Sequence, residues 1–380
     1  MNAGRISIRA ARISGVLLAL NALVVYGIDI PKPAEAAPPA APPPASVDVA
    51  PSDETAFYER LQYVTHKRNL VGLGMDDATL KSLALGSPDT TIASLSSRST
   101  GGDVNATIAL VRIQHWCNRV SSARPGNAQA QVQRLASVLP AERLPKMAGV
   151  FAAERAYQEK ARAGCSKAPF DYQGIESRLR GAAEAGDPAS ATELAQFVRD
   201  PAKREAFLEQ AAEKNYPPAM YALATNRLAA VQRNRSTENV SSIRLLLKQA
   251  GRTLPRAKVD LANCMATGCD GHPADGPGAA PFGLDAARDG EPLAFTSMLR
   301  MPWSGRLNRV QMLGWQYFGN RLNEEGCTGD GYVQNAVVFA QSISMLEKGV
   351  PPSMLQEAAA QAETLWQQSS ERAKREQGCG

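Results

Sequence analysis

Few residues in this chain have the type and spacing that enzymatic chemistry requires. The three histidines, His66, His115 and His272, lie far apart in the sequence, and each is expected to be a surface or packing residue. Two pairs of adjacent acids could serve as acid and base, Asp76 with Asp77 and Glu324 with Glu325, but acids at helix starts more often cap the helix. No nucleophile elbow, metalloprotease helix, phosphate loop or dinucleotide fingerprint occurs. The sequence therefore predicts no catalytic residue, no metal site and no cofactor.

Six cysteines form an even set that suits pairing in an oxidising compartment. They are Cys117, Cys165, Cys264, Cys269, Cys327 and Cys379. The sequence alone does not choose their connectivity. The preferred pattern joins Cys117 with Cys165, Cys264 with Cys269, and Cys327 with Cys379, because the first two pairs fall within local helical units and the third clips the terminal helix. The alternative is a zinc site at Cys264, Cys269 and His272, but it needs a fourth ligand and lacks the usual Cys-x-x-Cys spacing.

A cluster of aromatic residues between positions 302 and 332 is the candidate binding surface. Its members are Trp303, Trp315, Tyr317, Phe318 and Tyr332. One interpretation is a helix that buries Val310, Leu313, Trp315 and Phe318 against the rest of the fold. The other is that part of the cluster lines a groove for a peptide or a glycan, because exposed aromatic anchors contribute much of the energy of binding.

The elements that position these residues follow a pattern that is written four times. Residues 182–195, 211–224, 249–262 and 286–299 align so that four prolines fall in register, Pro188, Pro217, Pro255 and Pro292. The spacing between successive aligned prolines is typical of a solenoid of stacked helical hairpins. Each proline is expected at the first position of a helix, where its fixed φ is favourable and its missing N–H costs nothing. The segments between the copies differ in length, and one of them, at 267–283, is rich in Gly and Pro. We therefore expect these segments to be loops.

A fifth copy is expected near the C-terminus. The segment at 347–354 reads EKGVPPSM and matches EKNYPPAM at 213–220. Pro351 is expected to start a long helix whose polarity rises toward its end. This is how a capping helix looks when no further repeat covers its outer face.

At these residues the chain resembles the Sel-one-like repeat family, relatives of the tetratricopeptide repeat. The shared core is visible in AAEAGDPASATEL at 182–194 and AARDGEPLAFTSM at 286–298. The chain departs from the family in lacking the usual Leu-Gly-x-x-Tyr and Gly-x-Gly elements, and Asn215 and Thr253 replace the turn glycine in the middle copies. The resemblance implies an α-solenoid with a concave protein-binding surface, and the family includes exported members that carry disulfides.

The N-terminal segment has the pattern of an export signal. Arg5, Arg9 and Arg12 precede an uncharged run at 13–28, which is shorter than the roughly twenty residues of a membrane span. Residues 1–30 are therefore either a signal peptide, with an Ala-x-Ala site ending at Ala36, or a retained single-span anchor. Both place the following chain outside the cytoplasm, in the periplasm or cell envelope.

A Pro/Ala-rich linker at 31–52 is expected to act as a semi-rigid spacer. Beyond it, residues 53–168 read as an all-α region, with a small, polar segment at 86–102 predicted to be a loop. Residues 169–380 hold the repeats and the capping helix. The expected fold is therefore all-α, an α-solenoid of stacked helical hairpins with an N-terminal helical region.

Two functional hypotheses follow. The first is an exported, membrane-tethered scaffold that binds a partner protein or peptide in the cell envelope. The alternative is an exported enzyme that acts on an envelope polymer through carboxylates that converge only in three dimensions. A nucleic-acid partner is not expected, because the net charge of +5 is spread along the chain and aromatic residues make up only 6%. The sequence predicts no oligomeric state.

Overall fold

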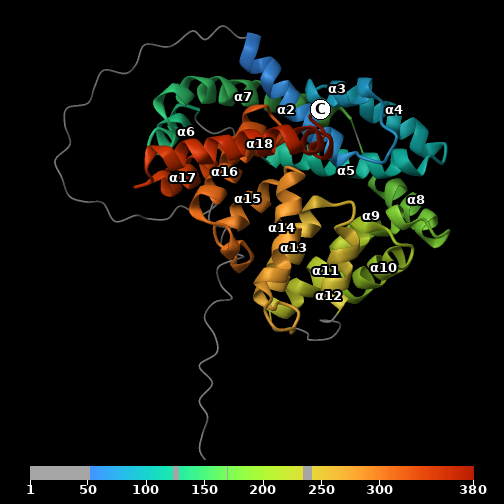
Figure 1. Cartoon of the computed structure of the whole chain (residues 1–380). Helices are drawn as coiled ribbons and strands as arrows, with labels where there is room; N and C mark the ends of the chain where they lie inside the picture. The colour runs from blue at the N-terminus through green and yellow to red at the C-terminus, as the bar shows by residue number, and fades with distance from the viewer. Residues whose placement is uncertain (1–51, 123–127, 169, 234–241) are drawn as a thin grey trace, which may run out of the picture.

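The computed structural model describes residues 52–122, 128–168, 170–233 and 242–380. In these ranges the chain forms seventeen α-helices and three short 3-10 helices, and no strand (Figure 1). The fold is all-α, as expected. The leader at 1–30 and the linker at 31–52 lie outside the described residues, apart from Ser52. Within the described ranges, no helix combines the length and the apolar character that a membrane span needs.

The first region packs its helices around α5. The helices are α2 (Ser52–Asn69), α3 (Asp77–Ala84), α4 (Pro88–Thr100), α5 (Val104–Ser122), α6 (Ala128–Leu135) and α7 (Leu144–Lys167). Helix α5 buries residues on most of its circumference, among them Ile108, Val111 and Trp116. This helix is central because it contacts α4, α7 and the first repeat helices.

The prediction of a loop at 86–102 is wrong, because Pro88–Thr100 forms α4. Pro88 lies in the first turn, where proline suits a helix. Ile92 and Leu95 are each 1% exposed and pack into the core. Packing of this apolar stripe outweighs the weak helix propensity of the Ser and Thr residues around it.

Four helical hairpins follow in the order of the repeat copies. They pair α8 (Tyr172–Glu184) with α9 (Pro188–Phe197), α10 (Pro201–Glu213) with α11 (Pro217–Gln232), α12 (Ser242–Ala250) with α13 (Pro255–Thr267), and α14 (Gly276–Arg288) with α15 (Pro292–Met298). The second helix of each hairpin begins at the aligned proline, as expected. Two residues after each proline, a small side chain is fully buried: Ser190, Ala219, Ala257 and Ala294. These small side chains let neighbouring helices approach closely, and successive helices pack against one another as a solenoid.

The turn inside each hairpin depends on backbone conformation. Gly186 and Gly290 adopt positive φ between their helices, a conformation that costs glycine little. Asn215 takes the same place in the second hairpin with a φ of 57°. Asparagine tolerates this left-handed conformation better than most residues, which explains why it replaces glycine in that copy.

The C-terminal helices do not form a fifth hairpin of the same kind. They are η2 (Pro302–Arg306), α16 (Arg309–Glu324), η3 (Gly329–Gly331), α17 (Tyr332–Glu347) and α18 (Pro352–Gln377). Helix α18 packs mainly against α16 rather than folding back on α17, and α16 contacts both. Pro351 is the N-cap of α18, so the long helix expected here begins directly after it. A Cβ at Gly314 of α16 would lie 3.2 Å from the Ala358 carbonyl oxygen, which shows how closely the two helices approach.

Helix α18 is also not a cap on an open array, because α2, the first described helix, contacts η3 and α18 (Figure 1). The N–H of Asp330 in η3 donates to the hydroxyl of Thr65 in α2 over 2.9 Å. At the other side of the first region, Arg112 Nε of α5 lies 2.7 Å from Glu193 Oε1 of α9. The N-terminal region therefore bridges the first hairpin and the last helices, and the helices form a closed circuit.

A buried carboxylate holds this circuit together near α14. Asp289, which is 2% exposed, accepts hydrogen bonds from Lys258 of α13 at 2.5 Å and from Arg372 of α18 at 2.6 Å. Its carbonyl accepts a bond of 2.9 Å from Gln377, whose side-chain oxygen accepts one of 2.9 Å from Arg68 of α2. We call these five residues the Asp289 cluster. It joins α2, α13, α14 and α18.

The structure contains three disulfides, and they join the pairs preferred from the sequence. Cys117–Cys165 links α5 to α7, Cys264–Cys269 closes the end of α13, and Cys327–Cys379 ties the turn after α16 to the end of the chain. The zinc alternative at Cys264, Cys269 and His272 does not form, because the two sulfurs are bonded to each other.

His66 of α2 belongs to the core rather than the surface. Its side chain is almost fully buried, and its ring packs edge-on against Trp116 with the ring centres 5.0 Å apart. Nε2 lies 3.1 Å from the Tyr157 hydroxyl, which itself donates to the Leu83 carbonyl. Nε2–H must therefore be the donor, in a neutral imidazole. Burial, reinforced by the charge of Arg119, lowers the pKa of His66 to about 4.

This environment predicts a pH-dependent loss of stability. In the unfolded chain His66 takes up a proton near pH 6.5, whereas the folded protein resists protonation down to about pH 4. As the pH falls from 7 to 4.5, the wild type should therefore lose up to about 3 kcal/mol of unfolding free energy relative to His66→Gln. Urea denaturation of both proteins at several pH values measures this difference. His115→Gln, at an exposed histidine of α5, is the control. If the unfolding free energies of the wild type and of His66→Gln differ by a constant amount across this pH range, the lowered pKa assigned to His66 is contradicted.

Candidate functional site

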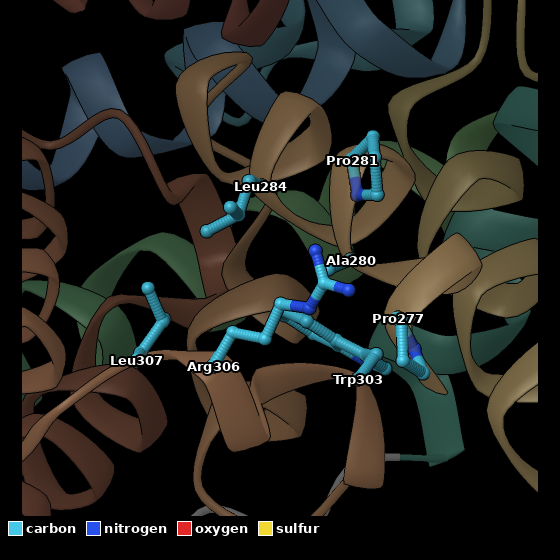
Figure 2. A pocket seen from close by; sticks show the side chains of 7 residues that line it. All are labelled: Pro277, Ala280, Pro281, Leu284, Trp303, Arg306 and Leu307. Carbon is cyan, nitrogen blue, oxygen red and sulfur yellow. The ribbon is translucent and has the colours of Figure 1, made fainter. Parts of the chain in front are cut away.

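A pocket of about 220 Å³ lies between α14 and η2. Pro277, Ala280, Pro281 and Leu284 line it from α14, and Trp303, Arg306 and Leu307 line it from the other side (Figure 2). The four residues of α14 are spaced three or four apart, so they share one face of the helix. All the lining side chains except Arg306 are apolar. We call this site the α14–η2 pocket.

Helix α14 forms here because of a cap and a proline in its first turn. Asp275 accepts a hydrogen bond of 2.8 Å from the N–H of Gly278, and Pro277 follows at a position where its missing N–H costs nothing. The sequence analysis assigned 267–283 to a loop, and that prediction is wrong from Gly276 onward. The cap and the packing of Ala279 and Gly283 in the interior outweigh the Gly/Pro-rich composition.

Pro281 lies inside α14 and changes its hydrogen bonding. A proline has no N–H, so the carbonyl of Pro277, four residues earlier, loses its usual helical donor. Both prolines line the pocket and are exposed. Helix α14 therefore contains one backbone carbonyl, that of Pro277, whose regular donor is missing.

Trp303 forms a fixed wall of the pocket. Its side chain is 1% exposed, and its Nε1–H donates to Asn263 Oδ1 over 2.9 Å. A Cβ at Gly283 would lie 2.7 Å from the indole ring, so the ring rests directly on the bare backbone of α14. Because the ring is held by packing and by a hydrogen bond, the wall is rigid.

Arg306 supplies the only charge among the seven lining residues. Its side chain is exposed and extends across the pocket between Leu307 and Ala280 (Figure 2). Among the described residues, none forms an ion pair or a side-chain hydrogen bond with it. The pocket thus combines apolar walls with one free cation. Such a site can bind an apolar group that carries a negative charge, but it contains no nucleophile, acid or base for catalysis.

Of the five aromatic residues predicted to bind, Trp303 alone lines this pocket. Trp315, Phe318 and Tyr332 are 4%, 0% and 1% exposed, so they cannot serve as exposed anchors of a groove. Trp315 and Phe318 are buried because α15, α17 and α18 cover α16 on several sides. Tyr332, at the start of α17, is buried against Phe57 of α2. Tyr317 is partly exposed, and its hydroxyl donates to Glu347 over 2.6 Å. The first interpretation from the sequence agrees with α16, because this helix buries Val310, Leu313, Trp315 and Phe318.

The paired acids considered in the sequence have structural partners. Asp76 caps α3 by accepting a hydrogen bond of 2.6 Å from the N–H of Thr79. Glu324 lies 3.1 Å from Lys146, and Glu325 lies 2.8 Å from Lys374. Among the described residues, no group of three or more His, Cys, Asp and Glu side chains could hold a metal ion.

A second polar cluster joins the helices α11, α13 and α15. The Tyr221 hydroxyl donates to Asp260 over 2.8 Å, and Arg256 lies 3.8 Å from Asp260 and 3.6 Å from Glu291. Burial raises the pKa of both carboxyl groups, while the nearby Arg256 opposes the rise. Glu291 also accepts a hydrogen bond from the N–H of Leu293 at the start of α15. One arginine is therefore shared between two carboxylates that come from successive hairpins.

The fold defines a helical-repeat protein, and the pocket is its candidate site. No protein-family model and no curated protein matches the chain. It is similar to the crystal structure of a protective antigen of uropathogenic Escherichia coli that displays an SLR fold, with 15% identity over 85% of this chain and 87% of that one, and a TM-score of 0.33. It is also similar to a Sel1 repeat protein from Oxalobacter formigenes, with 19% identity over 75% and 88%, and a TM-score of 0.31. Both similar structures are of the repeat type that the sequence resembles, and no residue role is transferred from them.

The contact between Gly283 and Trp303 predicts a loss of stability in Gly283→Ala. The added methyl group would lie 2.7 Å from the indole, and such overpacking typically costs about 1–3 kcal/mol. Urea denaturation should show this loss. Gly305→Ala is the matched control, because a Cβ there meets nothing within 4 Å, and a change of less than about 0.5 kcal/mol is expected. Equal unfolding free energies for the two variants would show that Trp303 is not held against α14.

Proposed function

We propose that this protein is a non-enzymatic scaffold of the cell envelope that binds a partner protein through the α14–η2 pocket. The observation that carries the proposal is the pocket itself, which joins a rigid apolar wall to an arginine that has no partner in the described part of the chain. Its volume is below the roughly 300–1,000 Å³ of typical small-molecule sites, so it suits a single side chain of a partner better than a metabolite.

Rigidity of the site supports a role in binding. Trp303 is fixed by Asn263 and by the backbone at Gly283. Helix α14 is fixed at its other end by the Asp289 cluster. A site that is already ordered before it binds loses less conformational entropy, which favours affinity. These contacts leave the pocket open to solvent while they restrain both of its walls.

Export is proposed from the leader and from the cysteines. Arg5, Arg9 and Arg12 followed by an apolar run have the pattern of a signal peptide or a single-span anchor. All six cysteines are paired in disulfides, which suits an oxidising compartment. The Pro/Ala-rich linker would then hold the folded region away from the membrane.

The alternative of an enzyme acting on an envelope polymer finds support in the raised pKa of Asp260 and Glu291. Each of these carboxylates nevertheless has structural partners. Asp260 accepts a bond from Tyr221, Glu291 caps α15, and both lie beside Arg256. These contacts connect successive hairpins, so a structural role accounts for the carboxylates and the binding role is preferred.

Site-specific photo-crosslinking in cells tests the proposal. A photoreactive amino acid at Pro277, an exposed residue on the pocket rim, should yield one discrete adduct with a second protein when the leader is intact. The same amino acid at Val71, which is 70% exposed and lies after α2, is the control and should yield none. Ala280→Leu, which fills the pocket, should abolish the adduct. The proposal fails if Pro277 gives no adduct, or if the adduct persists with the pocket filled.

A further inference from the structure

We propose that the α14–η2 pocket recognises the C-terminal residue of the partner chain, with its apolar side chain in the pocket and its terminal carboxylate on Arg306. This inference rests on the proposed scaffold function and names the chemistry of the partner. A C-terminal residue carries two groups close together, a side chain and a carboxylate. The pocket offers one counterpart for each of these groups.

The side chain corresponds to the apolar walls. Leu284 and Leu307 lie on one side of the pocket and Pro277 and Pro281 on the other (Figure 2). The volume of about 220 Å³ holds one aliphatic or aromatic side chain. Because the buried indole of Trp303 cannot move aside, a longer segment of chain would have to lie outside the pocket.

The carboxylate corresponds to Arg306. Arg309, which follows η2, is already engaged, because it donates to the carbonyls of Met345, Leu346 and Lys348. Arg306 has no such partner among the described residues, although it extends over the apolar walls. A guanidinium binds a carboxylate through two parallel hydrogen bonds, which is the strong form of such contacts.

An internal Asp or Glu of a partner would present its carboxylate on a separate residue from the apolar anchor. The single cation directly over a pocket for one side chain favours a residue that bears both groups.

The test uses the full chain and two tripeptide probes, N-acetyl-Gly-Gly-Leu with a free carboxylate and the same peptide as a C-terminal amide. Isothermal titration should show saturable binding of one acid per chain and about tenfold weaker binding of the amide. Arg306→Gln should weaken binding of the acid to the level of the amide and leave the amide unchanged. Arg300→Gln, which removes a charge from an exposed arginine outside the pocket, should change neither affinity by more than about twofold.

The inference would be overturned if the acid and the amide bind equally, or if Arg306→Gln weakens both to the same extent. It would also be overturned if Ala280→Leu leaves the binding of the acid unchanged. Unfolding free energies of each variant establish that the fold is retained. If neither peptide binds but the crosslink from Pro277 persists, the C-terminal specificity is wrong and the scaffold stands. If the acid binds as expected but no crosslink forms, the pocket recognises carboxylates and the scaffold function fails.

Discussion

The buried carboxylate of Asp289 is the constraint on which the closed arrangement of helices depends. A charge removed from water is costly unless it is paired and hydrogen-bonded. Lys258 and Arg372 provide those partners from helices far apart in the sequence. Burial alone would lower the pKa of Lys258, but its hydrogen bonds to Asp285 and Asp289 raise it above the ordinary value. The charges are therefore satisfied only while α13, α14 and α18 stay together.

The same helix carries both this cluster and the binding pocket. Asp285 lies in the second half of α14 and Asp289 is its C-cap, while Pro277, Ala280 and Leu284 line the pocket from the same helix. Burial tends to raise the pKa of Asp285, but hydrogen bonds from Lys258 and Arg372 hold it below its usual value. A helix that is fixed in this way can present a small pocket without reorganising when a ligand binds, because its position is set by contacts outside the pocket.

The features that the sequence predicts well depend on local chemistry. A proline marks the first turn of each second repeat helix, because its geometry is compatible with that position and with few others. The cysteine pairs also follow the order of the chain. The features that it misses depend on contacts between distant segments. Helix α4 forms because Ile92 and Leu95 find a core, and closure depends on pairs such as Thr65 with Asp330.

The pocket was missed for a related reason. Its apolar residues lie in a Gly/Pro-rich stretch that resembles a loop, and only the cap at Asp275 indicates a helix there. Three of the five aromatic residues predicted to bind, Trp315, Phe318 and Tyr332, are in the core instead. Large apolar side chains dominate both interiors and interfaces, and the sequence does not distinguish the two. The unpaired state of Arg306 also depends on which acids fold close to it, and that is decided by the tertiary structure.

Hydrogen–deuterium exchange of the full chain, with and without saturating N-acetyl-Gly-Gly-Leu, locates the binding site most directly. The account predicts slower exchange in residues 276–288 and 302–307, and no change in the helices that carry Tyr221, Asp260 and Glu291. Slower exchange confined to those other helices, with none at the pocket, would contradict it.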